Sequence, residues 1–339
     1  MKTPDQIEWN SLGFNYTQTP FNIRCYFRDG KWEEPTIHSE ETIPMHMAAS
    51  CLHYGQEAFE GLKAFNCEDG KIRLFRADKN AERLQNSAEY LKMAVPPKQL
   101  FIDMCTKLIS LNKDYVPPVE TGGSLYLRPL LIGTGAMVGV KPSNEYLLII
   151  FCTPVGSYFA NGMKGIKAII DRTHDRAAPF GTGHVKAGGN YAASLHSGDV
   201  AKDLGYDSAI YLDPTTHQFI DECGAANFFG IKNNTYITPC SNSVLPSITN
   251  MSLREIAEDL GLKVEARDIP VTELSTFEEA GACGTAAIIT PIDTIDDPAN
   301  NFSVTFKWVG PVTQQLYDRY KAIQLGKVPD EKGWNIIIE

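Results

Sequence analysis

The chain has 339 residues, and its 31 basic and 41 acidic side chains give a formal net charge of −10. A surface of this sign argues against nucleic acid or an anionic membrane as a main partner. The apolar content of 43% and the charged content of 21% are typical of a globular protein, and the length predicts about two domains. The longest apolar run, residues 146–152, is far too short to cross a membrane as a helix.

The N-terminus and the cysteines both favour a cytoplasmic protein. No apolar stretch follows the first residues, so we expect no secretory signal. Eight cysteines are scattered without paired spacing, which favours free thiols in a reducing cytosol over a disulfide framework. The seven histidines lack the spacing of a metal site, so we expect no bound metal.

Strands and helices alternate along the first half of the chain. Alternating apolar residues predict a strand over 21–27, which ends at the turn pair Asp29-Gly30. Residues 56–66 and 71–76 flank a second turn and predict a hairpin. Apolar spacing then predicts two helices, at 84–91 and 100–111, and two strands, at 124–132 and 146–152.

The second half begins after residues 154–165, whose Pro, Gly and polar content predicts a linker between domains at 1–153 and 166–339. Strands are expected at 167–172, 208–212, 218–222, 227–232 and 302–308. Helices are expected at 192–204, 251–260 and 311–325. Strands with interspersed helices indicate a mixed α/β (α+β) fold. No glycine-rich dinucleotide motif and no P-loop sequence is present.

The least ordinary segment is 181–191, in which Lys186 stands among glycines and precedes Asn190, a good helix N-cap. Glycine lets the backbone approach a ligand closely. A lysine that is enclosed can lose its proton, which Schiff-base chemistry requires. The alternative is a surface lysine in a flexible loop.

Four other segments leave two interpretations open. Glu222 either lies at the bottom of a cleft with a cationic partner or is exposed in a plain hairpin. The helix expected after 245–250 has an N-terminus that suits an anion, as every helix has. The small residues of 281–287 either turn backbone donors to a ligand or serve tight packing. Tyr126 and Arg128 share one face of a strand, where the arginine either binds a carboxylate or faces solvent.

Seven motifs stand in order along the chain: LHYGQEAFEGLKAF (52–65), RLFRADKNAERL (73–84), LYLRPLLIG (125–133), KAGGNYAASL (186–195), ECGAANFF (222–229), LPSIT (245–249) and GTAAIITP (284–291). Together they resemble the class IV pyridoxal-phosphate aminotransferases, and most closely the branched-chain amino-acid aminotransferases. The resemblance runs from about Phe14 to the last expected helix. It implies a two-domain fold of type IV, with a small N-terminal α/β domain and a larger C-terminal pseudo-barrel domain.

The resemblance also implies the cofactor, pyridoxal 5'-phosphate, and the residues that bind it. Lys186 would form the Schiff base with the cofactor, Tyr191 would hydrogen-bond the ring O3′, and Glu222 would pair with the pyridine nitrogen. The phosphate would be bound by Arg76, the backbone amides of Ile248 and Thr249, and Thr285.

The implied substrate residues are Phe14, Tyr54, Phe59, Tyr126, Arg128, Thr285 and Ala286. Backbone donors at the last two would hold the α-carboxylate, and the three aromatic residues at 14, 54 and 59 would accept a leucine, isoleucine or valine side chain. Tyr54 would come from the neighbouring subunit of a homodimer. Arg128, with Tyr126, would hold the side-chain carboxylate of glutamate or 2-oxoglutarate. We therefore expect Arg76, Arg128 and Lys186 to concentrate positive charge in one cleft of this acidic protein.

The implied activity is transamination of L-leucine, L-isoleucine and L-valine with 2-oxoglutarate, giving branched-chain 2-oxo acids and L-glutamate by a ping-pong mechanism. A D-amino-acid transaminase or an aminodeoxychorismate lyase on the same fold is the alternative, although Tyr126 and Arg128 favour the L-branched-chain type. A non-catalytic binding protein is a more distant alternative.

Three positions depart from the family's pattern. Ser247 and Asn250 stand where relatives often have Gly and Arg in L-P-G-x-T-R, and Ala225 stands where some have a hydroxyl residue. We therefore do not expect the Asn250 side chain to bind phosphate.

Overall fold

The computed structural model describes residues 1–158, 162–307 and 309–338. Residues 159–161 of the predicted linker, Trp308 of a predicted strand and Glu339 of the predicted second domain lie outside these ranges. By its internal contacts the chain divides into two compact units. The first comprises Met1–Ala160, Val185–Gly188 and Ala322–Glu339, and the second comprises Asn161–His184 and Gly189–Lys321.

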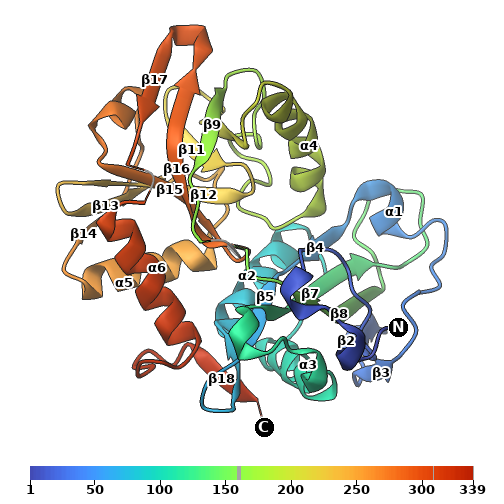
Figure 1. Ribbon diagram of the computed structural model, residues 1–339. Coiled ribbons are helices and arrows are strands. Elements are labelled where there is room, and N and C mark those ends of the chain that lie inside the picture. Colours follow the sequence, from blue (N-terminus) through green and yellow to red (C-terminus); the bar gives the residue numbers. More distant parts are fainter. Residues whose placement is uncertain (159–161, 308, 339) are drawn as a thin grey trace. The chain divides into compact units, whose positions relative to one another are not determined.

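The first unit contains an antiparallel sheet in the order β18-β6-β5-β7-β8-β1-β2, with β3 paired to β1 and β4 paired to β7 (Figure 1). Its strands are β1 (Asn22–Arg28), β2 (Lys31–Trp32), β3 (Thr36–His38), β4 (Glu57–Phe59), β5 (Leu62–Asn66), β6 (Ile72–Phe75), β7 (Ser124–Gly133), β8 (Tyr146–Val155) and β18 (Asn335–Ile338). Its helices are α1 (Ser50–Tyr54), α2 (Ala77–Tyr90) and α3 (Lys98–Leu111). Apolar faces of α2, α3 and the central strands form one core, in which Leu84, Leu108 and Leu127 are fully buried.

A buried ion pair locks α2 onto this sheet. Glu60, in the link between β4 and β5, is fully buried, and Arg83 donates from Nε and Nη2 to its two carboxylate oxygens at 2.7 and 2.8 Å. Asn80 Nδ2 adds a third bond to Glu60 at 2.7 Å. A buried carboxylate left without these donors would be strongly destabilising, so the pair fixes α2 and the residues at its N-terminus.

The second unit contains a mixed sheet in the order β11-β10-β9-β16-β15-β12-β13-β14, with β17 paired to β16. Its strands are β9 (Ile166–Asp171), β10 (Ser208–Leu212), β11 (Ile220–Cys223), β12 (Ala226–Lys232), β13 (Thr235–Thr238), β14 (Lys263–Ala266), β15 (Glu279–Gly284), β16 (Ile288–Asp297) and β17 (Phe302–Thr305). The helices that follow these strands are α4 (Gly188–Asp203), α5 (Ile248–Asp259) and α6 (Pro311–Gln324). Because β11 also pairs with β12, six strands close into a ring, the pseudo-barrel that the resemblance implied. The mixed α/β class is confirmed.

The structure corrects several predicted segments. β8 continues through Val155, so the predicted linker begins with two strand residues. The segment expected to be a turn over 281–287 is strand as far as Gly284, and β16, with its Pro and acidic residues, was not expected at all. Helix α4 begins at Gly188, so Asn190 lies inside its first turn and is not the N-cap. The division into domains at 1–153 and 166–339, with a linker at 154–165, stays a prediction. The structure adds that the C-terminal strand β18 pairs with β6 of the N-terminal sheet.

Asp221 in β11 is an acid buried inside the second unit. Ser241 Oγ donates to its Oδ1 at 2.9 Å. Burial nevertheless raises the pKa of Asp221 to about 6, because the Ser241 bond and the charge of Arg176 offset only part of the desolvation. Since this native pKa lies above the unfolded value, the native state binds the extra proton, and stability falls as pH rises from about 4 through about 6.

We therefore predict that Asp221→Asn stabilises the protein at pH 7.5, by about 2–3 kcal/mol, because the amide keeps the Ser241 bond without a buried charge. Urea unfolding of the two proteins at pH 7.5 and pH 4 would measure this. Most of the gain should be lost at pH 4, because Asp221 is protonated in the native state and partly protonated in the unfolded chain. A difference that is equal at both pH values would contradict the prediction.

Candidate functional site

Lys186 is held by its backbone in the first unit. Its carbonyl accepts from Phe59 N at 3.1 Å, and its amide donates to Ser87 Oγ at 3.1 Å. Two residues on, Gly188 N donates to the Glu57 carboxylate. Bonds on both sides of the lysine thus tie this segment to β4 and α2, so the interpretation as a flexible surface loop is wrong.

The Lys186 and Arg128 side chains meet at one aromatic ring. Lys186 Nζ lies 4.8 Å and Arg128 Cζ 4.9 Å from the centroid of Phe59. Arg128 Nη2 also donates to the Tyr126 hydroxyl at 3.0 Å, and Phe14 packs edge-on against Tyr126 with centroids 5.0 Å apart. The structure therefore brings together Phe14, Phe59, Tyr126 and Arg128 with the lysine. Two of the three cations that were expected in one cleft, Arg128 and Lys186, thus lie at the same ring, and their sharing a cleft with Arg76 stays a prediction.

The Arg128 guanidinium keeps bonding capacity for a ligand. Its Nε is buried, and it has no hydrogen-bond partner among the residues that the structure describes. The neighbouring Tyr126 hydroxyl needs glycine at position 61, because a Cβ there would collide with its oxygen. The solvent-facing alternative for Arg128 is thus wrong.

Glu57 is a titratable group of this cluster that the sequence analysis did not identify. Burial raises the pKa of the Glu57 carboxyl, and the Gly188 hydrogen bond and the Arg128 charge oppose this rise. Tyr54 lies elsewhere in the unit, exposed on α1, where its hydroxyl donates to the carbonyl of Val138.

Arg76 is a buried cation with an unusual backbone. It lies at the N-cap of α2 with φ of 53° and ψ of 32°, in the left-handed region, and its side chain is 3% exposed. A non-glycine residue in this conformation persists only where its surroundings enforce it. The Arg76 guanidinium lies over the Trp334 ring, 4.5 Å from its centroid.

In the second unit, Glu222 is a buried carboxylate with an ion-pair partner. It is 1% exposed, and its Oε1 accepts from Leu245 N at 2.6 Å and from Asn227 Nδ2 at 3.1 Å. Its Oε2 pairs with Arg176 Nε. Glu222 does lie in a hairpin, but the exposed alternative is wrong. The sequence required a cation for a buried Glu222 without indicating which one.

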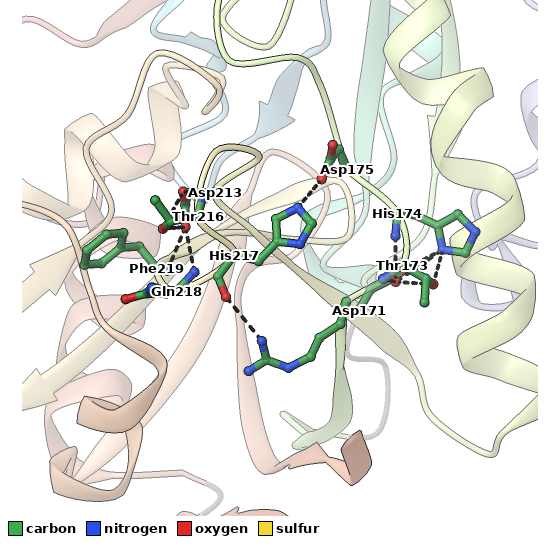
Figure 2. A network of polar contacts seen from close by, with 10 residues as sticks. Asp171, Thr173, His174, Asp175, Asp213, Thr216, His217, Gln218 and Phe219 are labelled. Carbon is green, nitrogen blue, oxygen red and sulfur yellow. Dashed lines mark hydrogen bonds and ion pairs between the residues drawn. The ribbon is translucent and has the colours of Figure 1, made fainter. Parts of the chain in front are cut away.

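Arg176 is in turn fixed by the polar network of its own loop. Its Nη1 donates to the carbonyls of Gly183 and Ser243 at 2.9 and 2.7 Å. Figure 2 shows how the preceding residues are anchored: the Asp171 carboxylate accepts from the amides of Thr173 and His174 at 2.8 and 3.0 Å.

The same network reaches the loop that leads into β11 (Figure 2). His217 Nε2 pairs with Asp175 at 2.8 Å, and the His217 carbonyl accepts from Arg172 at 3.2 Å. Asp213 closes this loop by accepting from the amides of Gln218 and Phe219 at 2.8 and 2.9 Å. These hydrogen bonds join the loop before Arg176 to the loop before Glu222, which helps to hold the two charged side chains next to each other.

The start of helix α5 explains two departures from the family pattern. Ser247 is the N-cap, and its Oγ accepts from Asn250 N at 3.2 Å. The buried residues Ile248 and Thr249 begin the helix, where backbone N–H groups lack intrahelical acceptors and suit an anion.

The Asn250 side chain takes part in an internal network. Its Nδ2 donates to Asn227 Oδ1 at 3.0 Å and to Thr238 Oγ1 at 2.8 Å, and its Oδ1 accepts from Tyr236 at 2.9 Å. Asn227 bonds Glu222, so this network connects the helix to the buried carboxylate. Both ends of the amide are engaged, as expected for a side chain that does not bind phosphate.

The turn after β15 carries Thr285, half-buried, and Ala286, exposed. It ends at Ile288, whose φ of 67° is strained for a β-branched residue. In the preceding strand segment, a Cβ at Gly281 would meet the Phe229 ring at 2.6 Å, which supports tight packing there. That backbone donors of 285–287 face a ligand stays a prediction. Burial raises the pKa of the neighbouring Cys283 to about 12, so this thiol is a buried apolar filler.

Tyr191 is half-buried in the first turns of α4, and its carbonyl accepts from Ser194 Oγ at 2.8 Å. Asn190 and Thr182 exchange two bonds of 2.7 Å that fix this helix start. Within the described ranges, acidic, histidine and cysteine side chains do not gather in threes as a metal site would require. Nor does any helix of the described chain have the length and apolarity to cross a membrane.

Comparison with known proteins places this chain in a family. The model of class IV amino-transferases matches residues 57–295. A branched-chain-amino-acid aminotransferase from Helicobacter pylori is 49% identical over 337 residues, with 98% of each chain covered. One from Haemophilus influenzae is 46% identical, covering 98% of this chain and 99% of its own. The crystal structure of the Escherichia coli branched-chain amino acid aminotransferase superposes with a TM-score of 0.80 at 26% identity, covering 95% of this chain and all of that one. The chain belongs to the class IV aminotransferases.

Proposed function

We propose that the protein is a pyridoxal-phosphate-dependent transaminase that transfers the amino group of L-leucine, L-isoleucine or L-valine to 2-oxoglutarate. The relatives with 46–49% identity over nearly the whole chain, all named for this activity, support it. The observation that carries it is the meeting of Lys186 and Arg128 at the Phe59 ring. A lysine able to move a proton lies beside an arginine able to bind a carboxylate.

The donor set fits pyridoxal phosphate. A buried carboxylate, Glu222, suits a protonated pyridine nitrogen, and a helix N-terminus and a buried arginine suit a phosphate. When bound, this cofactor supplies an electron sink for the electrons released at the substrate Cα. The residues we assign to it are Arg76, Lys186, Tyr191, Glu222, Ile248, Thr249 and Thr285.

In this proposal each side chain has one task. The Lys186 amine would remove the proton from the substrate Cα and deliver it to C4′ of the cofactor. The ion pair with Arg176 and the N–H bonds that Glu222 accepts favour the ionised form of the Glu222 carboxylate. An ionised carboxylate there would keep the pyridine nitrogen of the cofactor protonated. The turn amides at Thr285 and Ala286 bind the α-carboxylate.

One pocket has to accept both an isoleucine and a glutamate side chain, and the surroundings of Arg128 support both. Its guanidinium lies over the rings of Phe59 and Tyr126, with Cζ 4.9 and 5.3 Å from the centroids. Two aromatic faces stabilise the cation when an apolar side chain is bound, so the charge is not buried without a partner. Its Nε still offers a donor to a carboxylate.

The activity test compares amino donors with 2-oxoglutarate as acceptor. We predict turnover with L-leucine, L-isoleucine and L-valine, at rates that agree with one another within about 200-fold, because one methylene in an apolar pocket is worth about 1–3 kcal/mol. Glutamate formation would be measured by a coupled assay. Activity only with D-alanine would refute the proposal and identify a D-amino-acid transaminase. Cleavage of aminodeoxychorismate without transamination would identify a lyase instead.

We also predict that Lys186→Ala abolishes transamination, with a loss of at least about 10³-fold, because general acid–base and covalent steps both depend on the amine. The fold should survive, since the bonds of this segment come from its backbone. Borohydride treatment of the wild-type holoenzyme should leave the reduced cofactor on a peptide containing Lys186. Near-normal turnover of the variant would show that another group is the base.

We further propose a cytoplasmic homodimer in which Tyr54 completes the neighbouring subunit's site. All eight cysteines are free thiols, which supports a reducing compartment. In the first unit, Met47, Val138 and Val140 are 88%, 80% and 85% exposed, and Leu52 and Tyr54 of α1 are exposed as well. The Tyr54 hydroxyl bond to Val138 and a bond from Met137 N to Ala48 O at 2.9 Å join the two segments. Apolar surface of this extent supports an interface between copies.

The paired variant Val138→Asp/Val140→Asp should therefore yield monomers, because two charges would be desolvated in each contact. Light scattering after size-exclusion chromatography measures the mass, and activity should fall with it. Leu260→Asp, at an exposed apolar residue of the second unit, is the matched control and should stay dimeric. A wild-type monomer with full activity would rule out the dimer proposal.

A further inference from the structure

The C-terminal segment meets Arg76 through both its backbone and its side chain. Arg76 N donates to the Trp334 carbonyl at 2.7 Å, and the Arg76 guanidinium carbon lies 4.5 Å from the centroid of the Trp334 ring. Trp334 is 5% exposed although it lies only five residues from the C-terminus. Trp334 thus contacts the buried Arg76 twice, once through its backbone carbonyl and once through its buried ring.

The backbone of Arg76 depends on the same contact. The β6–β18 ladder pairs Phe75 with Asn335 and ends there, and Arg76, the residue after β6, turns into the left-handed region at the start of α2. This conformation is unfavourable for a non-glycine residue and has to be enforced by its surroundings. The bond to the Trp334 carbonyl supplies that enforcement.

Trp334 is itself held firmly in place. The Asp330 carboxylate accepts from Trp334 N at 3.0 Å and from Asn335 N at 2.7 Å, which fixes the entry to β18. The Phe75 ring packs edge-on against the indole with centroids 5.7 Å apart. The indole is therefore a rigid platform, which a flexible tail would not provide.

We propose that Trp334 is the positioning residue for the cofactor's phosphate group. Contact with the indole fixes the plane of the Arg76 guanidinium, and because the N–H donors lie in that plane, the ring sets the direction from which a phosphate oxygen can accept them. The ring also stabilises the positive charge of the buried guanidinium. This inference rests on the proposed function, which assigns Arg76 to the phosphate.

A phosphate-positioning role makes a specific prediction about two forms of the cofactor. Trp334→Leu should raise the dissociation constant of the full-length apoenzyme for pyridoxal 5'-phosphate by about tenfold, the effect of about 1.4 kcal/mol. The dissociation constant for pyridoxal, which lacks the phosphate, should stay unchanged. Trp334→Phe, which keeps a ring face, should lie between Leu and wild type. Reconstitution followed by absorbance measures both constants.

The control variant is Ile337→Ala, at an exposed residue of β18, the strand that follows Trp334, and it should alter neither constant. Arg76→Leu, alone and combined with Trp334→Leu, tests the assignment of Arg76 to the phosphate separately from the positioning role of Trp334. If Arg76→Leu does not weaken pyridoxal-phosphate binding, the assignment of Arg76 within the proposed function is wrong. If it does weaken binding, the added Trp334→Leu should have little further effect.

Three results would overturn the inference itself. Trp334→Leu could weaken pyridoxal and its phosphate equally, which indicates a merely structural role. It could weaken neither while Arg76→Leu weakens the phosphate form, or the two substitutions could be fully additive. Should Trp334→Leu fail to fold, Trp334→Phe decides between the same outcomes, because the ratio of the two constants is unaffected by the fraction of protein that folds.

Discussion

A carboxylate that is 1% exposed has to be paired, and the architecture around Glu222 follows from that requirement. Arg176 provides the opposite charge, and the carbonyls of Gly183 and Ser243 hold its guanidinium. The residues just before it are joined to the loop that enters β11 (Figure 2). Leu245 N and Asn227 provide the remaining hydrogen bonds to Glu222. One buried negative charge thus determines the placement of a hairpin, a preceding loop and the entry to helix α5.

The first unit handles its buried charges in two different ways. Arg83 is paired with the Glu60 carboxylate, and this ion pair holds α2 against the sheet. Arg76 lies over the Trp334 ring, and the partly buried Arg128 and Lys186 lie over the Phe59 ring. An aromatic face stabilises a nearby cation through its electrostatic attraction. The three cations that we propose to bind anions therefore share an aromatic contact, whereas Arg83 is held by a carboxylate.

Local patterns predicted much of this structure, and long-range contacts account for what they missed. Periodic apolar residues located α2, α3 and α5, and the glycines around Lys186 identified that segment from its composition. β16 was missed because it contains Pro291 and several acidic residues, whose place in a sheet depends on neighbours far along the chain. Arg176 and Trp334 were missed for a similar reason. Nothing near them in sequence indicates that one meets Glu222 and the other meets Arg76.

Ser247 and Asn250 bear on how the charge of a phosphate would be balanced in the proposed site. Ser247 caps α5, and Asn250 turns inward to Asn227, Thr238 and Tyr236, so neither side chain contributes a cation at the helix start. Backbone amides and the helix dipole contribute only partial charge, about half an elementary charge at a helix N-terminus. A phosphate carries more charge than that, so the proposed site needs a cation in addition to the helix start. In our proposal this cation is Arg76, whose guanidinium lies 4.5 Å from the centroid of the Trp334 ring, so the proposed role of Trp334 matters more because residues 247 and 250 supply no positive charge.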